Sequence, residues 1–249
     1  MTLAYDTAGH GDPPLLLLHG WCCHRGFLAP QYEYFSARQR VVAVDLPGHG
    51  ASAFAGEGSM EDFADRVAEP VAALGVSGAV VVGHSLGASV ALALGRDHPE
   101  LVSALVLLDP APLERAVMER ALGPLVASAQ EFAARRSAFV DRMFLPTDDT
   151  DRRAWIVAEM LAVPDDVAVA TGQAGVRFDG VAALRACSVP VLSIGSAVPS
   201  NPPHFLRDTS PGIVIGQTVG SGHFHQLEVP EQVNPMIERF LDIAFAAVP

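Results

Sequence analysis

Short aliphatic runs alternate along this chain with stretches of helical apolar spacing, and this alternation most limits how the chain can fold. The runs are almost uniformly apolar, which is typical of strands covered by helices on both faces of a parallel sheet. We therefore predict an α/β fold with a mostly parallel, doubly wound sheet and right-handed crossovers. Six runs predict its strands: Leu15–His19, Val41–Asp45, Ala79–Gly83, Ala104–Asp109, Val189–Gly195 and Ile213–Thr218.

Helical patterns lie between these strands, at Met60–Leu74, Leu86–His98 and Glu231–Ala247. The stretch between Pro110 and Arg185 differs, because it contains no strand pattern. So long a helical stretch between two core strands predicts a helical insertion, residues 111–185, in a core made of residues 1–110 and 186–249. Three or four helices are expected in it, with Gly123-Pro124, Pro146 and Pro164 as the breaks. Their ranges are Leu113–Ser128, Gln130–Phe144, Asp151–Val163 and Asp165–Val176.

The charge balance excludes several kinds of partner. The 249 residues include 28 acidic and 16 basic ones, all of the latter arginine, for a net charge of −12. Such a surface repels phosphate backbones and anionic membranes, so we expect neither nucleic acid nor a membrane as partner, and a homodimer is left open. Cys22, Cys23 and Cys187 make no disulfide framework. Reduced thiols, an N-terminus unlike a signal peptide and the lack of a long apolar span favour a cytoplasmic location.

The strongest chemical signal is the segment Gly83-His84-Ser85-Leu86-Gly87. It follows a predicted strand and opens a predicted helix, and a serine in such a tight turn has its hydroxyl pushed outward. Glycine on both sides gives the room that the turn needs, and the helix N-terminus stabilises negative charge beside it. We predict that Ser85 is a nucleophile.

A serine hydroxyl is a weak nucleophile near neutral pH and needs a base. His223 follows the strand Ile213–Thr218, so we expect it at the same carboxyl edge of the sheet as Ser85. His225 either competes for this role or lies behind it. The pair also suggests a metal, but no carboxylate or cysteine stands at matching spacing, so we predict none. Three other histidines are expected to pack loops: His19, His49 and His84.

An oxyanion needs N–H donors. Leu86 supplies one as the residue after the nucleophile, and Trp21, in the loop after the first aliphatic run, is the candidate for the second. The Trp21 side chain either walls a substrate pocket or packs in the core. The segment Gly48–Ala53 loosely fits a dinucleotide fingerprint, but Pro47 interrupts the turn and no helix pattern follows directly, so we expect no nucleotide cofactor.

Together these residues resemble the α/β-hydrolase superfamily over nearly the whole chain. The matching segments are His19-Gly20-Trp21, Asp45–Ser52, Gly83–Gly87, and Gly222-His223 followed by Glu228-x-Pro230. The resemblance implies a Ser–His–acid triad, an oxyanion hole, a cap over the site and no cofactor. Esterases, lactonases, C–C bond hydrolases, cofactor-free perhydrolases and receptor-like binding proteins share these motifs.

The chain departs from that family where the triad acid is usually found. The loop 196–203 after the strand Val189–Gly195 has no Asp or Glu, and Asp208 comes too late. Asp109 ends the strand next to the one that delivers Ser85, and some branches of the family place the acid there. We therefore predict that Asp109 orients His223 and stabilises its imidazolium. Asp208, a dyad without an acid and an inactive fold are the alternatives.

These residues predict a serine hydrolase that cleaves an ester or lactone of a largely apolar small molecule. The alternatives are a C–C bond hydrolase or cofactor-free perhydrolase on the same triad, or a ligand-binding protein with little turnover. The cap is expected to select bulky, apolar substrates, and Trp155 is the predicted substrate contact. Its large apolar residues are Met118, Phe132, Phe139, Met143, Phe144, Trp155 and Met160.

Overall fold

The computed structural model describes residues 3–54 and 58–246. Within these residues one seven-stranded sheet has the order β1-β3-β2-β4-β5-β6-β7, with β1 antiparallel to β3 and every other pair parallel. This confirms the predicted α/β fold with a mostly parallel sheet. The strands are β1 (Tyr5–Ala8), β2 (Leu15–Leu18), β3 (Val41–Val44), β4 (Ala79–His84), β5 (Val102–Leu108), β6 (Val191–Gly195) and β7 (Val214–Gln217).

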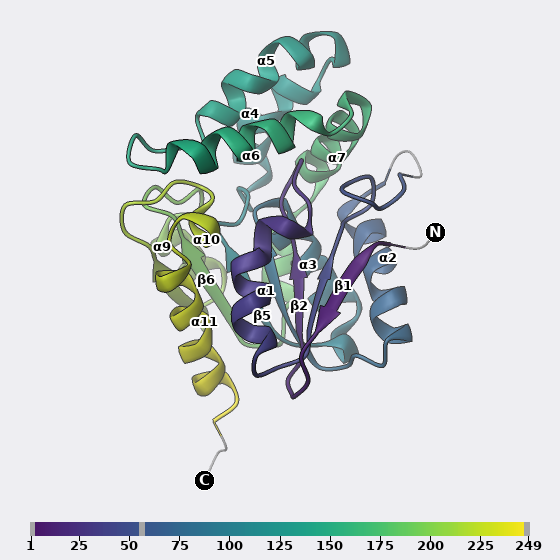
Figure 1. The fold of residues 1–249 in the computed structure, drawn as a ribbon, viewed down its shortest axis with the longest axis vertical. Coiled ribbons are helices and arrows are strands. Elements are labelled where there is room, and N and C mark those ends of the chain that lie inside the picture. The colour runs from purple at the N-terminus through teal and green to yellow at the C-terminus, as the bar shows by residue number, and fades with distance from the viewer. Residues whose placement is uncertain (1–2, 55–57, 247–249) are drawn as a thin grey trace.

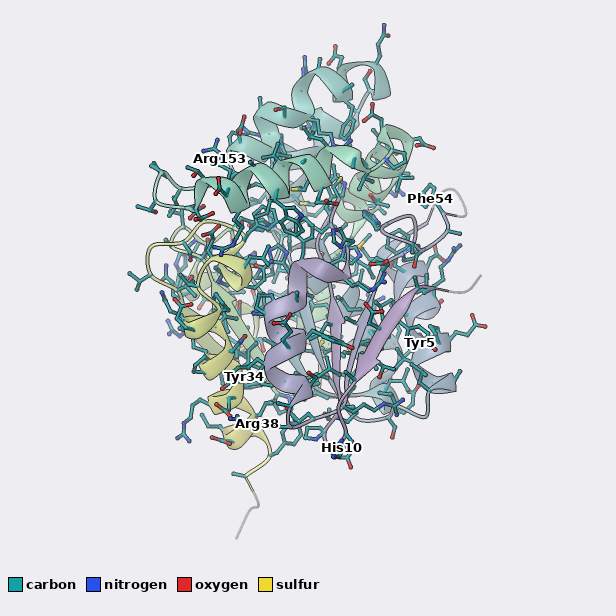
Figure 2. All side chains as sticks on the ribbon, viewed as in Figure 1. Tyr5, His10, Tyr34, Arg38, Phe54 and Arg153 are labelled. Carbon is teal, nitrogen blue, oxygen red and sulfur yellow. The ribbon has the colours of Figure 1, made fainter. Side chains whose placement is uncertain are left out.

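Alternate residues of the central strands supply two apolar clusters, one on each face of the sheet. Leu16 and Leu18 pack with the helices α2 and α3, whereas Leu15 and Leu17 pack with α1 and α11. Figure 2 labels Tyr34 on α1 and Arg38 two residues after the end of α1. Both interact with Glu238 of α11, so the two segments are also joined at their surface. The helices of the two faces are α1 (Ala29–Ser36), α2 (Met60–Ala73), α3 (Leu86–Asp97) and α11 (Pro230–Ala244).

The predicted helix Glu231–Ala247 is thus found as α11, while Ala247 lies outside the described residues. Short helices that the sequence did not predict complete the core. These are η1 (Arg25–Leu28), η2 (Pro99–Leu101), α8 (Gly180–Ala186), α9 (Pro203–Thr209) and α10 (His225–Glu228).

Helices α4 to α7 form a layer over one end of the sheet (Figure 1). The chain enters this layer after β5 and leaves it before α8, which packs against α3 and α9 of the core. The layer therefore lies over the carboxyl end of β5. We call α4 to α7 and the loops between them the cap. Its helices are α4 (Arg115–Val126), α5 (Ala129–Asp141), α6 (Thr150–Ala162) and α7 (Asp165–Arg177).

Candidate active site

Ser85 lies in a sharp turn between β4 and α3, with φ 53° and ψ −117°. This backbone conformation is rare for a residue with a side chain and is typical of functional positions. The turn is tight enough to require glycine on either side. A Cβ on Gly83 would lie 2.5 Å from Gly87 O, and one on Gly87 would lie 2.3 Å from His19 O. The Ser85 N–H donates to Leu108 O at 3.0 Å, which fixes the turn to β5.

Asp109 directly follows β5, and its side chain contacts the His223 ring. His223 Nδ1 lies 2.7 Å from Asp109 Oδ2, and the Ser196 N–H donates to Asp109 Oδ1 at 3.1 Å. Burial alone would raise the pKa of Asp109, but the hydrogen bond and the charge of His223 outweigh it and hold that pKa below its usual value. An ionised Asp109 only accepts, so the Nδ1 proton belongs to His223 and Nε2 is left as its basic atom.

The backbone of His223 is held on both sides. Its N–H donates to Met143 O at 2.9 Å, and its carbonyl accepts from His84 Nε2 at 3.0 Å. Ser85 and His223 line the same cavity. Within the described residues no hydrogen bond joins the Ser85 hydroxyl to the His223 ring. Catalytic contacts of this kind commonly shorten only when substrate binds.

His84 was expected to pack a loop. It lies directly before Ser85 and bonds to the loop that carries His223. A carbonyl accepts only, so the contact to His223 O places the His84 proton on Nε2. Burial, and then the charge of His223, lower the pKa of His84 well below its usual value. A neutral imidazole therefore fixes the carbonyl of the residue that carries the candidate base.

His19 and His49 shape the loop that carries Trp21. The Leu46 N–H donates to His19 Nε2 at 2.9 Å, and the Cys22 N–H donates to His49 Nε2 at 3.2 Å. Burial lowers the pKa of both rings, that of His49 to about 4, so both accept these bonds as neutral imidazoles. The bond to His49 holds Cys22, whose φ of 56° is a left-handed conformation beside the candidate oxyanion hole.

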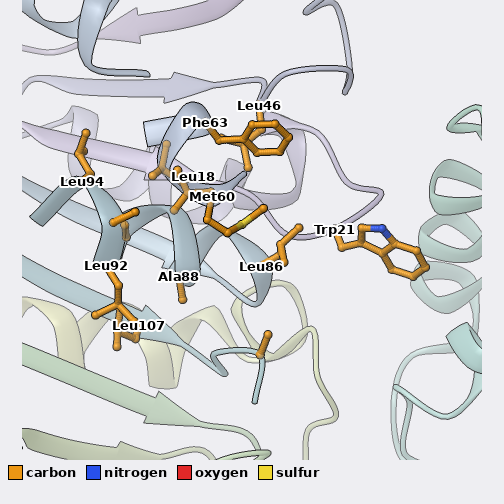
Figure 3. Packing of buried hydrophobic residues seen from close by; sticks show 14 of the residues in the cluster. Leu18, Trp21, Leu46, Met60, Phe63, Leu86, Ala88, Leu92, Leu94 and Leu107 are labelled. Atoms are coloured by element: carbon orange, nitrogen blue, oxygen red, sulfur yellow. The ribbon is translucent and has the colours of Figure 1, made fainter. Parts of the chain in front are cut away.

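The two predicted oxyanion donors border the cavity that contains Ser85. Leu86 is the first residue of α3, so its N–H has no partner within the helix. The Trp21 side chain donates from Nε1 to Ala168 O of α7 at 2.8 Å and packs edge-on against Phe132 and Phe139. In Figure 3 Trp21 lies apart from the other core residues and points towards the cap helices, so it both lines the cavity and anchors the cap.

The cavity has a volume of about 480 Å³ and lies between the sheet edge and the cap. Its core side carries Ser85, His84, Asp109 and His223. Arg120 and Arg142 also line it, and the Arg142 guanidinium lies 5.1 Å from the centre of the Phe139 ring. The cap side is mainly apolar, and its large apolar residues include Met118, Leu122, Phe139, Met143, Phe144 and Met160.

Trp155, the predicted substrate contact, does not lie in the cavity, and that prediction is wrong. Its ring packs 4.8 Å from Phe27 and 6.1 Å from His24, and 38% of the residue is exposed. It therefore covers the outer joint between α6 and η1. The spacing of apolar residues along α6 marks one face of the helix, but it does not show which of those residues reach the cavity.

The alternatives for the base and the acid lie elsewhere. His225 is buried behind His223, with Nδ1 3.2 Å from Thr218 Oγ1, and burial lowers its pKa to about 4. Asp208 is exposed on α9. Sequence reasoning missed Asp148, a buried cap residue that accepts the Gly222 N–H at 3.0 Å. Its partner is distant in the chain, and no local pattern marks it.

Comparisons with known proteins identify the family of the fold. A family model described as "alpha/beta hydrolase fold" matches residues 13–167. A pimeloyl-[acyl-carrier protein] methyl ester esterase of Nitrosomonas europaea is 30% identical over 91% of this chain and 94% of its own. Three other curated relatives are matched over only 41%, 65% and 42% of their own lengths.

Two solved structures share the fold. An esterase from Thermogutta terrifontis has a TM-score of 0.85 at 24% identity, over 97% of this chain and 93% of that one. The enol-lactonase from Burkholderia xenovorans LB400 has a TM-score of 0.83 at 19% identity, over 96% and 95%. In the described residues no helix is long and apolar enough to cross a membrane.

Proposed function

The chain belongs to the α/β-hydrolase family, and from this premise we propose that it is a serine hydrolase that cleaves an ester or lactone of a largely apolar small molecule. The observation that carries the proposal is the 2.7 Å contact between His223 Nδ1 and Asp109 Oδ2 in the cavity that contains Ser85. A base oriented by a buried acid, beside a serine in a strained turn, is the arrangement that acyl transfer needs.

In the proposed reaction His223 Nε2 takes the proton from the Ser85 hydroxyl as Ser85 Oγ attacks the substrate carbonyl. The N–H groups of Trp21 and Leu86 stabilise the oxyanion. The imidazolium, stabilised by Asp109, gives its proton to the leaving alkoxide, and the acyl group remains on Ser85. Water, activated by the same base, then releases the acid and restores the serine.

The lining of the cavity supports a refinement of the substrate. Its wall is mainly apolar, yet Arg120 and Arg142 border it in a chain whose net charge is −12. Neither arginine forms an ion pair with another described residue. They favour an apolar substrate with a negatively charged group at one end, because a guanidinium pairs well with a carboxylate or phosphate. The Nitrosomonas europaea relative is named as an esterase of a pimeloyl methyl ester, and an ester substrate of this general kind is compatible with the refinement.

The deciding experiment is a panel of chromogenic esters and lactones measured against a Ser85→Ala control. At each chain length, one ester ends in a methyl group and its partner in a carboxylate. Hydrolysis that depends on Ser85 supports the proposal, and faster hydrolysis of the carboxylate member supports the refinement. Loss of that preference in Arg142→Gln, with methyl-ended esters unaffected, assigns it to the arginine.

Other outcomes of the same panel point to the alternatives. A burst of product without turnover indicates a binding protein that retains an acylable serine. Inertness to all esters and lactones directs the search to C–C bond hydrolysis or perhydrolysis on the same residues.

The free cysteines Cys22, Cys23 and Cys187 are compatible with the proposed cytoplasmic location.

A further inference from the structure

The loop between α5 and α6 binds the loop that carries His223. We call residues 143–148 the clasp and residues 218–224 the histidine loop. Met143 O accepts the His223 N–H at 2.9 Å, and Asp148 Oδ1 accepts the Gly222 N–H at 3.0 Å. Thr147 Oγ1 donates to Gly220 O at 3.3 Å. Two successive N–H groups of the histidine loop are therefore bound by the cap and not by the core.

Asp148 is the side chain that organises the clasp. Its Oδ2 accepts the Leu145 N–H at 2.8 Å, and its own N–H donates to Leu145 O at 3.1 Å. Only 8% of the residue is exposed. One carboxylate oxygen thus closes the turn of the clasp while the other binds the histidine loop. The bond to the Gly222 N–H is buried, so this donor needs an acceptor within the protein.

Gly222 shows how closely the two loops approach each other. A Cβ at this position would lie 2.5 Å from Asp148 Oδ2 and 2.6 Å from Met143 O. Any larger residue would push the clasp away. The glycine beside the candidate base is therefore explained by the cap that packs on it.

We propose that Asp148 is a positioning residue for His223. The inference rests on the proposed function, in which His223 is the base. His84 fixes the carbonyl of His223 from the core, and the clasp fixes its N–H from the cap. If Asp148 releases Gly222, the backbone on the cap side is free to shift. The imidazole then moves relative to both Ser85 and Asp109, and a small displacement of a catalytic group is costly in rate.

The first test is Asp148→Asn. An amide keeps one acceptor oxygen but presents N–H donors where the second acceptor stood, so one of the two bound N–H groups loses its partner. We expect kcat to fall about 10- to 100-fold, with KM changed less than about threefold, because the base is displaced while the cavity persists. Asp149→Asn is the matched control: the residue is exposed, it caps α6, and asparagine caps equally well.

The second test approaches the same contact from the core. Gly222→Ala inserts a methyl group against the clasp and is expected to lower kcat by a similar factor. Arg177→Gln, which removes a distant contact between α7 and Gly58 O, is expected to leave kcat within about twofold. If Asp148→Asn does not fold, Gly222→Ala decides. The proposal is overturned by a folded Asp148→Asn or, failing that, a folded Gly222→Ala, with wild-type kcat.

A spectroscopic readout needs no substrate. A histidine Nδ1 proton bound to a carboxylate gives a far-downfield proton resonance, which Asp109→Asn assigns by removing it. We expect this resonance to shift or broaden in Asp148→Asn and to persist in Asp149→Asn. A wild-type protein that hydrolyses nothing but shows this pattern would overturn the proposed function and leave the positioning role intact. An unchanged resonance in Asp148→Asn would overturn the positioning role alone.

Discussion

The sheet edge and the cap hold the three candidate triad residues in different ways. Ser85 and Asp109 end neighbouring strands whose register pairs His84 with Leu108. Backbone bonds fix both residues, because the Ser85 N–H binds Leu108 O and the Asp109 N–H binds Ile194 O at 2.8 Å. His223 lies in a loop that depends on the cap and on one buried histidine. Nucleophile and acid are thus set by strand register, whereas the base depends on contacts with segments distant in the sequence.

The largest effect is expected at the sheet edge. Ser85→Ala removes the nucleophile, so the steady-state kcat on the best ester of the panel should fall about 10⁴- to 10⁶-fold. Circular dichroism should show an unchanged fold, because alanine fits the same turn. A variant that retained about a tenth of wild-type turnover would show that Ser85 is not the nucleophile.

Asp109→Asn tests the other residue fixed by the strands. The amide keeps the shape but no longer holds the His223 proton on Nδ1, so kcat should fall about 10²- to 10⁴-fold with little change in KM. The matched control is Asp208→Asn on the exposed face of α9, which should behave as wild type. The reverse result, with Asp208→Asn inactive and Asp109→Asn active, would move the acid to α9.

The same contrast explains what the sequence could predict. The six parallel strands and the Ser85 turn were predictable, because an all-apolar run and a Gly-x-Ser-x-Gly turn are local patterns. β1 was missed because Tyr5, Asp6 and Thr7 form an exposed edge with no apolar run. Asp109 could be proposed from its place at a strand end, since strand order brings such ends together. Asp148 could not, because its contact with Gly222 joins segments that no periodicity relates.

The part of the cavity wall that α4 supplies should control selectivity and not chemistry. Met118→Ala removes part of the apolar wall and its contacts with a bulky substrate. The kcat/KM for a bulky apolar ester should therefore fall about tenfold, while that for an acetyl ester changes little. Trp155→Ala serves as the control, because Trp155 packs against Phe27 outside the cavity, and its KM should match wild type. Equal losses on acetyl and bulky esters in Met118→Ala would contradict a selective role for the cap.

The smallest expected effect concerns stability and not turnover, and it comes from His49, which bonds to the loop that carries Trp21. His49, packed near His19, Asp45 and Arg136, has its pKa lowered from 6.5 to about 4 by burial. Below pH 6.5 the unfolded chain gains a proton that the folded one does not, so the free energy of unfolding falls until about pH 4. His49 should contribute about 2 kcal/mol to the loss between pH 7 and pH 5.

Urea titrations at the two pH values check this contribution. In His49→Gln the loss of unfolding free energy on acidification should be smaller than in wild type, because the glutamine does not titrate. An identical loss in the two proteins would show that His49 is protonated in the folded state as readily as in the unfolded chain.

The strand register also decides which part of the site is lost first on warming. The Ser85 and Asp109 N–H groups bind carbonyls of neighbouring strands, whereas those of Gly222 and His223 bind the cap. We therefore expect the first pair to exchange with deuterium more slowly than the second. Mild heating that loosens the cap therefore displaces the base while the nucleophile and acid stay in register. Activity should be lost before the sheet unfolds. It should return on cooling, because the cap can form its contacts again on a sheet that has stayed folded.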